Sequence, residues 1–209
     1  MSAHPTAASD PKAVARQDTV SVVLAGVGGQ GILLASEILA RAALTAGFDV
    51  KTNEVHGMAQ RGGSVIAQVR FGREVFSPLV ARGSARVLGA LERVEALRQH
   101  QFLAADGLAV VSSQMIVPVT VSSGQTTYPA DVEERLRAAF PRLVYVDAVE
   151  KATGLGNHRA ANLVVLGAMA HALDLPDEAW RKAIRSSVKP QYVEVNLKAF
   201  AAGRECARL

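Results

Sequence analysis

Cysteine is nearly absent from this sequence, since Cys206 is the only one among 209 residues. One cysteine cannot form a disulfide within the chain, and it cannot supply the several ligands that a structural zinc site or an iron–sulfur cluster needs. Aromatic residues are also scarce, at 5% against 49% hydrophobic residues, so a core would be built from small aliphatic side chains. We therefore expect an aliphatic core and no cysteine-ligated centre on this chain.

Long hydrophobic runs and dense blocks of one charge are missing too. The longest apolar run, NLVVLGAMAHAL, is too short and too interrupted for a membrane span, which needs about 20 apolar residues. Residues 1–18 lack the apolar segment of a secretory signal, and their Ala, Ser, Pro and Asp content predicts a disordered tail. The net charge is only +4, without a Lys/Arg cluster typical of nucleic-acid binding. We expect a cytoplasmic protein without membrane or nucleic-acid partners.

The hydrophobic periodicity predicts one α/β domain over residues 19–203, followed by a tail at 204–209. Strands are predicted at 21–25, 48–55, 64–72, 75–80, 86–91, 108–112 and 142–147. Helices are predicted at 32–46, 92–103, 129–139, 159–173, 177–187 and 192–202. Strands followed by helices favour a three-layer, Rossmann-like fold with helices on both faces and a helical C-terminal end. The predicted hairpin at 64–80 interrupts the alternation, so we expect a mixed sheet.

A glycine-rich turn follows the first predicted strand in VSVVLAGVGGQGILLASEIL. Gly26, Gly28 and Gly31 fit G-x-G-x-x-G between a strand and a helix, which is the context that the dinucleotide motif requires. Glycines permit a tight turn and close approach, and the free N–H groups at a helix start attract anions. The same glycines can also serve strand–helix packing alone. The pattern leaves both interpretations open.

A nicotinamide cofactor is the first candidate for such a turn. An NAD site also needs an acidic residue near the end of the next strand, about 20 residues on. Glu54 occupies that position, but the loop HGMAQRGGS follows it directly, and ordinary nicotinamide enzymes do not usually have that loop there. A stand-alone NAD(P)-binding reductase is therefore the alternative and not the leading hypothesis.

The loop from His56 to Ser64 is the second candidate site. Arg61 can hold a phosphate or carboxylate with two hydrogen bonds, and His56 can donate a hydrogen bond or move a proton. A flexible hinge with a surface arginine is the competing interpretation. No nucleophile–base arrangement or metal-binding motif is readable in the sequence. The chain is therefore predicted to bind a ligand, with His56 and Arg61 facing the active site.

A third segment, GLGNHRAANLVVLGAM, combines asparagines with an apolar helix pattern. Asn157 is placed to cap the helix, and Asn162 lies within it. His158 and Arg159 at its start can reach an anion or face solvent. Propensity favours a core helix with a cap over a binding site.

Taken together, the two glycine loops resemble the gamma-type domain of the 2-oxoacid:ferredoxin oxidoreductase family, and within it the indolepyruvate type. The likeness runs through VVLAGVGGQGILLASEIL, EVHGMAQRGGSVIAQVRFG, FSPLV, LERVEALR and NHRAANLVVLGAMA, and covers Val20 to Ala202. The resemblance implies a subunit of an enzyme that oxidatively decarboxylates 2-oxoacids and passes electrons to ferredoxin. Thiamine diphosphate, Mg and [4Fe-4S] clusters are then implied on a large partner subunit, through which ferredoxin is reached.

The resemblance also implies a site shared by the two subunits. Coenzyme A is the implied acceptor there, with release of a free arylacetate as the alternative. Carried over by motif, the residues that would bind or face the ligand are Gly26, Gly28, Gly29, Gln30, Gly31, Gln60, Gly62, Gly63, Ser64 and Asn162. A purely structural scaffold, in which neither loop meets a ligand, is a third possibility. An obligate subunit should also expose apolar surface when alone, and the candidates are the helices after Asp147 and the strand at 75–80.

Overall fold

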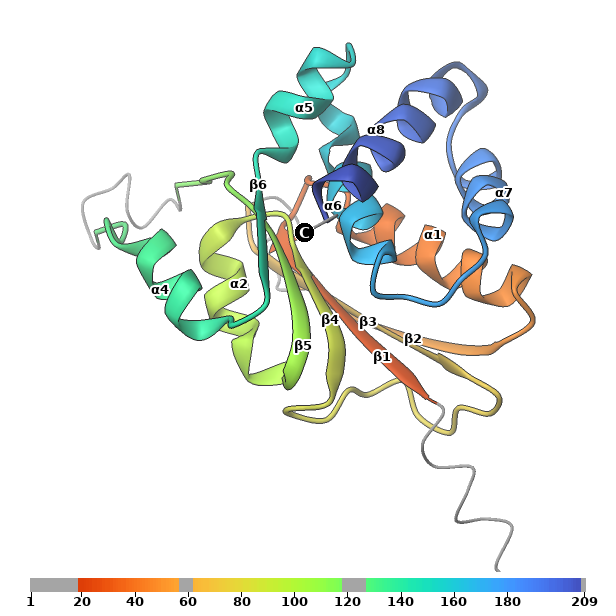
Figure 1. Cartoon of the computed structure of the whole chain (residues 1–209), viewed down its shortest axis with the longest axis horizontal. Coiled ribbons are helices and arrows are strands. Elements are labelled where there is room, and N and C mark those ends of the chain that lie inside the picture. The colour runs from red at the N-terminus through yellow and green to blue at the C-terminus, as the bar shows by residue number, and fades with distance from the viewer. Residues whose placement is uncertain (1–18, 57–61, 118–126, 208–209) are drawn as a thin grey trace, which may run out of the picture.

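A six-stranded mixed sheet forms the centre of the molecule (Figure 1). The computed structural model describes residues 19–56, 62–117 and 127–207. The strand order is β2-β3-β1-β4-β5-β6. The strands are β1 (Val20–Val27), β2 (Asp49–His56), β3 (Ser64–Gly72), β4 (Ala85–Ala90), β5 (Leu103–Ser112) and β6 (Leu143–Val146). β3 runs antiparallel to both β1 and β2, whereas β1, β4, β5 and β6 are parallel, so the prediction of a mixed sheet is confirmed.

Helices cover both faces of this sheet, as predicted. One face carries α2 (Arg93–Gln99) and α4 (Val132–Ala139). The other face carries α1 (Ile32–Thr45), α5 (Ala148–Gly154), α6 (Ala161–Ala170), α7 (Asp177–Ser187) and α8 (Val193–Cys206). Short 3-10 helices are η2 (His100–Phe102), η3 (His158–Ala160) and η4 (Pro190–Tyr192). None of the described helices is long and apolar enough to cross a membrane.

The alternation of side chains along β1 creates two separate cores. Val22 and Leu24 point into the core beneath α1, α6 and α8, whereas Val23 points into the core beneath α2 and α4. Every residue of α6 from Asn162 to Ala170 is buried, because this helix lies between the sheet and α8. β1, which leads into the glycine-rich region, and α6 therefore both lie at the centre of the fold.

The predicted strand at 75–80 is wrong. β3 already has a partner on each edge, β1 and β2, so no edge is left for a hairpin strand. The segment is instead fastened by two side chains: the Val75 N–H donates to Asp49 Oδ2 (2.8 Å) and the Val80 N–H to Gln68 Oε1 (2.9 Å). Phe76 projects from it with 86% exposure.

Several predicted bounds also differ from the structure, and one helix was not predicted. The helix expected to run to residue 103 ends at Gln99, because β5 begins at Leu103 and includes five residues that lack a hydrophobic pattern. Helix α5 was not predicted, although Asp147 accepts a hydrogen bond from the Glu150 N–H (2.9 Å), a cap that the spacing D-x-x-E indicates. Helix α8 continues past Ala202 to Cys206.

Candidate functional site

The glycine loop lies where the chain changes from one face of the sheet to the other. β1 leads into α1 on one face, and the neighbouring parallel strand β4 leads into α2 on the opposite face. In open α/β sheets, such a switch at the carboxyl ends of two adjacent strands leaves a crevice that binds ligands. The topology therefore places residues 28–31 at a favourable position for a site.

Two glycines of this loop adopt conformations that other residues rarely adopt. Gly29 has a φ of 101° and Gly31 a φ of 81°. Gly31 is also the N-cap of α1, and no side chain caps this helix or places a negative charge in its first turn. The first N–H groups of α1 are therefore available to an anion.

Gln30 fixes the loop with its side-chain amide. Its Oε1 accepts from the Val27 N–H (2.7 Å), and its Nε2 donates to Leu91 O (2.7 Å) and to Gln114 Oε1 (2.8 Å). A Cβ at Gly26 would lie 2.7 Å from Gln30 Oε1, so Gly26 makes room for this arrangement. Gln30 thus ties the loop to the ends of β4 and β5, and Gly26 supports it from inside β1.

A cleft of about 490 Å³ opens above the loop. It is lined by Gly28, Gly29, Gln30, Gly31, Leu34, Leu91, Gln114, Ile116, Val149, His158, Arg159, Ala161 and Asn162. Asn162 Nδ2 donates to Gly31 O (3.1 Å), and its Oδ1 accepts from the Leu163 N–H (2.9 Å). The structure therefore brings Gly28 to Gly31 and Asn162 into one site. It also confirms Asn157 as a cap, since Asn157 Oδ1 accepts from the Arg159 N–H (3.1 Å).

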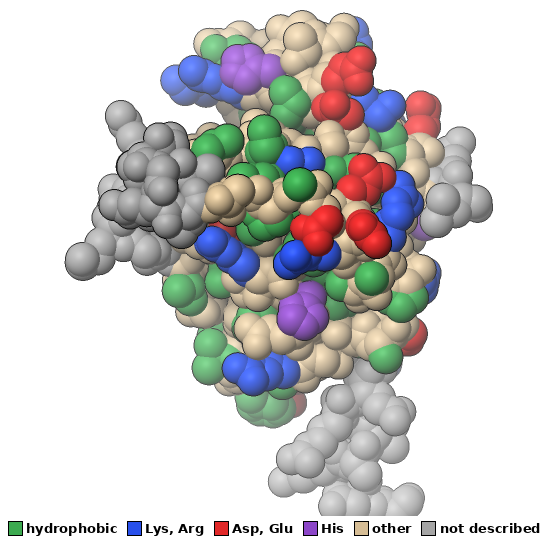
Figure 2. Space-filling model, turned by 90° about the vertical axis from the view of Figure 1, so that its left-hand side faces the viewer, with side chains coloured by type: hydrophobic (Ala, Val, Ile, Leu, Met, Phe, Trp, Pro, Cys, Tyr) green, Lys and Arg blue, Asp and Glu red, His purple; other side chains and the backbone are tan. Residues whose placement is uncertain are grey.

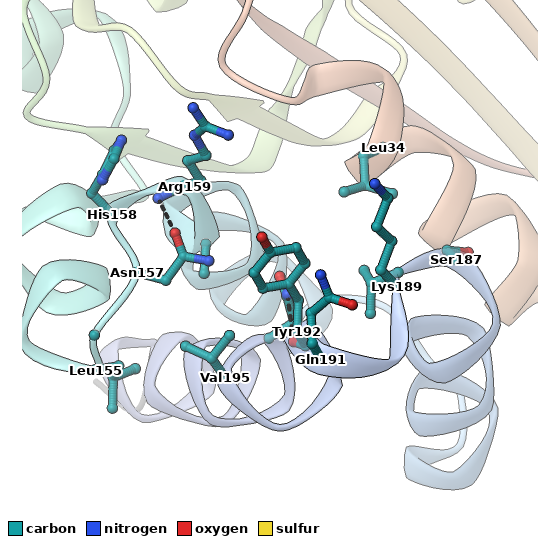
Figure 3. A pocket seen from close by; sticks show the side chains of 14 residues that line it. Leu34, Leu155, Asn157, His158, Arg159, Ser187, Lys189, Gln191, Tyr192 and Val195 are labelled. Carbon is teal, nitrogen blue, oxygen red and sulfur yellow. Dashed lines mark hydrogen bonds between the residues drawn. The ribbon is translucent and has the colours of Figure 1, made fainter.

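A wider groove of about 900 Å³ continues from this cleft and shares Leu34, His158 and Arg159 with it. Figure 3 shows Tyr192 lying between Arg159 and Lys189 in this groove. No acidic residue is among the residues that line either space. The charged ends of Arg159 and Lys189 form no ion pair within the described part of the chain. The combined surface is therefore suited to an anionic ligand.

The described end of the second loop, Gly62 to Ser64, contacts the glycine loop and lies outside the cleft. Gly62 has a φ of 80°, Gly63 O accepts from the Gly28 N–H (2.8 Å), and Ser64 Oγ donates to Glu95 Oε2 (2.6 Å). Gly62, Gly63 and Ser64 do not line the cleft. His56 is the last residue of β2, and Gln60 and Arg61 lie outside the described residues.

The geometry disfavours the nicotinamide alternative. In the usual dinucleotide fold the second strand lies beside the first, which brings its acidic residue to the glycine loop. Here β3 separates β2 from β1, so Glu54 pairs with Ala67 and lies one strand farther away. Its carboxylate contacts Ser36 Oγ instead (3.4 Å).

Sequence reasoning missed a polar cluster at the start of α2. Glu92 is 2% exposed, caps α2, and accepts from Tyr128 Oη (2.8 Å). Burial, together with the carboxylate of Glu92, raises the pKa of Tyr128 to about 12. Arg93 donates to the same Tyr128 oxygen (3.0 Å). Glutamate is not among the residues preferred at an N-cap, and Tyr128 is 36 positions away from Glu92, so local pattern indicates neither contact. No group of three His, Cys, Asp or Glu side chains suited to a metal occurs in the described ranges.

Comparison with known proteins gives relatives that are subunits of oxidoreductases or of a 2-oxoglutarate synthase. The family model for pyruvate ferredoxin/flavodoxin oxidoreductase matches residues 21–206. Indolepyruvate oxidoreductase subunit IorB of Thermococcus kodakarensis is 42% identical, and that of Pyrococcus horikoshii is 43% identical. Each alignment spans 196 residues, covering 90% of this chain and 96% of the relative. A 2-oxoglutarate synthase subunit KorC of Methanothermobacter marburgensis is 32% identical over 185 residues.

Solved structures agree with this assignment. The gamma subunit of a keto/oxoacid ferredoxin oxidoreductase from Geobacter sulfurreducens has a TM-score of 0.67 at 26% identity, covering 90% of this chain and 98% of that one. For fold alone, a 2-oxoglutarate:ferredoxin oxidoreductase from Magnetococcus marinus has a TM-score of 0.69 at 19% identity, covering 92% and 31%. These likenesses confirm the predicted three-layer α/β fold. The chain belongs to the pyruvate ferredoxin/flavodoxin oxidoreductase family, as a small subunit of a 2-oxoacid:ferredoxin oxidoreductase.

Proposed function

We propose that this chain forms one wall of the active site in a thiamine-diphosphate-dependent indolepyruvate:ferredoxin oxidoreductase. The observation that carries the proposal is the surface that runs from the glycine loop to Lys189, which is lined by basic side chains and by no acidic ones. Its role is to hold and orient the acyl acceptor, while a large partner subunit carries thiamine diphosphate, Mg and the [4Fe-4S] clusters and passes electrons to ferredoxin. The high identity to IorB subunits supports indolepyruvate or another arylpyruvate as the oxoacid.

The acceptor that fits this surface best is coenzyme A. Its phosphates match the uncapped N-terminus of α1 and the side chains of Arg159 and Lys189. The exposed ring of Tyr192 offers a face for stacking a base, and Ser187 Oγ is buried in the groove without a hydrogen-bond partner in the described chain. The related enzyme from Magnetococcus marinus has been solved with coenzyme A and succinyl-CoA bound, which supports the same class of acceptor.

The partner subunit is proposed to dock on the edge of the sheet that surrounds the glycine loop. Four of the exposed large hydrophobic residues lie around this edge: Leu33, Val55, Met115 and Val117. Covering them would also close the cleft and exclude water from the reaction. The side of the molecule that carries α4 is different, because acidic and basic side chains lie next to one another there (Figure 2), including the ion pair of Glu133 with Arg137 (2.7 Å).

The subunit assignment is tested by co-purification from the native host. We expect a brown partner carrying clusters and thiamine diphosphate, and we expect the isolated chain to be colourless and inactive. Turnover of indolepyruvate by the isolated chain would contradict the proposal. So would binding of NAD(H) that is lost in Glu54→Ala.

The acceptor site is tested in the assembled complex with Arg159→Gln and Lys189→Gln. Each change removes one charge from the groove, so we expect the KM for coenzyme A to rise about tenfold, as for loss of about 1.4 kcal/mol from a charged hydrogen bond. The KM for the 2-oxoacid should not change. Lys182→Gln on the exposed side of α7 is the matched control. An unchanged KM for coenzyme A in both variants would contradict the proposal that the acceptor binds in this groove.

A further inference from the structure

Two carboxylates are buried at the start of α2 outside the cleft. Glu92 is 2% exposed and Glu95 is 4% exposed, and neither lines the cleft. Burial of a carboxylate is costly unless hydrogen bonds compensate for the lost water. Their partners therefore indicate what these two side chains stabilise.

Glu92 uses its two oxygens for different purposes. Oε2 caps α2 by accepting from the N–H groups of Val94 (2.7 Å) and Glu95 (2.9 Å). Oε1 faces away from the helix and accepts from Tyr128 Oη (2.8 Å) and from the Ile116 N–H (3.4 Å). Glu92 thus connects α2 to the chain that follows β5.

Arg93 reinforces the same connection. Its N–H donates to Gln114 O (3.2 Å), and its guanidinium group lies 5.0 Å from the centre of the Tyr128 ring. Gln114 is held from the other side by Gln30, and both Gln114 and Ile116 line the cleft. The wall opposite α6 is therefore fixed between the glycine loop and the first turn of α2.

Glu95 makes a comparable connection to the second loop. Its Oε2 accepts from Ser64 Oγ (2.6 Å), while Oε1 accepts from Arg98 (2.8 Å). Ser64 begins β3, and the preceding Gly63 accepts from the Gly28 N–H. One helical turn therefore holds the chain on both sides of the glycine loop.

We propose that Glu92 and Glu95 are positioning residues that anchor two segments, residues 113–117 beside the cleft and residues 62–64 behind the glycine loop, to the start of α2. The proposal deepens the proposed function and rests on it for the identity of the acceptor. A wall held by a buried carboxylate loses its orientation when the bond to that carboxylate is removed, even though no ligand-contacting group is changed. The anchor therefore affects binding of the acceptor through Gln114 and Ile116.

The test uses Tyr128→Phe and Ser64→Ala. Each change removes one hydroxyl group that donates a hydrogen bond to a buried carboxylate. Hydrogen–deuterium exchange of the full chain should be about fivefold faster at residues 112–117 in Tyr128→Phe and at residues 62–66 in Ser64→Ala, as for loss of one hydrogen bond. In the assembled complex, Tyr128→Phe should raise the KM for coenzyme A severalfold while kcat stays within about twofold. Ser84→Ala is the control, because its hydroxyl bonds only Ala81 O on the surface.

Each result decides the proposal. Unchanged exchange in both variants would overturn the anchor, and faster exchange with an unchanged KM would reduce it to a purely structural tie and overturn the positioning role. If Tyr128→Phe lowers the melting temperature strongly, Glu92→Gln replaces it, since the amide keeps the shape and replaces one acceptor oxygen with an NH2 group. A wild-type complex that does not respond to coenzyme A would contradict the proposed acceptor, and the exchange measurement would still decide the anchor.

Discussion

At the residue scale, the contact between Gly31 and Asn162 joins the glycine loop to α6 without space for a side chain. A Cβ at Gly31 would lie 2.6 Å from Asn162 Nδ2, the same atom that donates to Gly31 O. The loop therefore depends on glycine at this position for two reasons. The backbone has a positive φ, and the Asn162 side chain leaves no room for a Cβ. Gly47 also has a positive φ (89°) but has no atom within 4 Å of its Cβ position.

These two glycines form a matched pair for mutation. Alanine at either position adopts the left-handed region at a cost of about 1–2 kcal/mol. Gly31→Ala should lose about 1 kcal/mol more, because it displaces the Asn162 hydrogen bond. Urea unfolding of Gly31→Ala and Gly47→Ala measures the difference in unfolding free energy. Equal losses would show that the contact with Asn162 adds nothing to stability.

The sequence predicted part of this site and not the rest, for a physical reason. Gly29 and Gly31 were predictable because a turn with positive φ imposes glycine at both positions. Asn162 was identified through the family resemblance, although local propensity favoured a core role. Gln114 and Lys189 could not be predicted, because each reaches the site from a distant segment; Gln30 and Gln114 are 84 positions apart. The roles of Gln60 and Arg61 stay predictions.

At the scale of elements, α6 and α8 cross with their backbones almost in contact. A Cβ at Gly167 would lie 2.0 Å from Phe200 O, and one at Gly203 would lie 1.9 Å from Val164 O. Each helix therefore supplies one glycine against a carbonyl of the other. This close crossing is what lets α6 lie buried between α8 and the sheet.

Gly167→Ala should consequently destabilise the protein. The added methyl group has to push the helices apart, at a cost of about 1–3 kcal/mol or more in a packed core. Gly154→Ala in the last turn of α5 is the control, since its Cβ would meet no atom within 4 Å and alanine favours a helix by up to about 1 kcal/mol. Thermal unfolding compares the two variants. A melting temperature of Gly167→Ala at or above that of the wild type would contradict this view of the crossing.

The elements themselves were largely predictable, because strong hydrophobic periodicity decides between helix and strand. β3 and α7 match their predicted bounds, 64–72 and 177–187. The failure at 75–80 has another cause: whether an extended segment becomes a strand depends on a free edge, and β1 had already taken that edge of β3. A local hydrophobic pattern does not determine which distant strands pair.

At the scale of the whole molecule, exposed apolar residues lie at two opposite ends of the sheet. Leu33, Val55, Met115 and Val117 lie at the end of the sheet that holds the cleft, whereas Phe76 and Leu79 project from the segment beside the start of β1. The helices after Asp147, expected as an apolar surface, bury most of their hydrophobic residues in the core instead. The proposed active site shared with the large subunit requires the partner at the cleft end.

Leu33→Asp and Phe76→Asp distinguish the two ends. An aspartate at position 33 suits the first turn of α1, so the fold should be kept while docking is disturbed. We expect Leu33→Asp to weaken assembly with the large subunit about tenfold or more, as for an interface anchor, and Phe76→Asp to leave it unchanged. Titration of the purified partner with each variant measures both affinities. The reverse result would place the partner at the other end of the sheet.

The Gly31–Asn162 contact also has a consequence for how the protein is made. The two residues are 131 positions apart, so the glycine loop leaves the ribosome long before Asn162, which bonds to Gly31, has been synthesised. α6 in turn is buried only when α8, the last helix, packs on it. A nascent chain truncated before residue 162 therefore carries the whole G-x-G-x-x-G motif and still lacks a formed cleft. The earliest motif of the sequence is among the last parts of the molecule to mature.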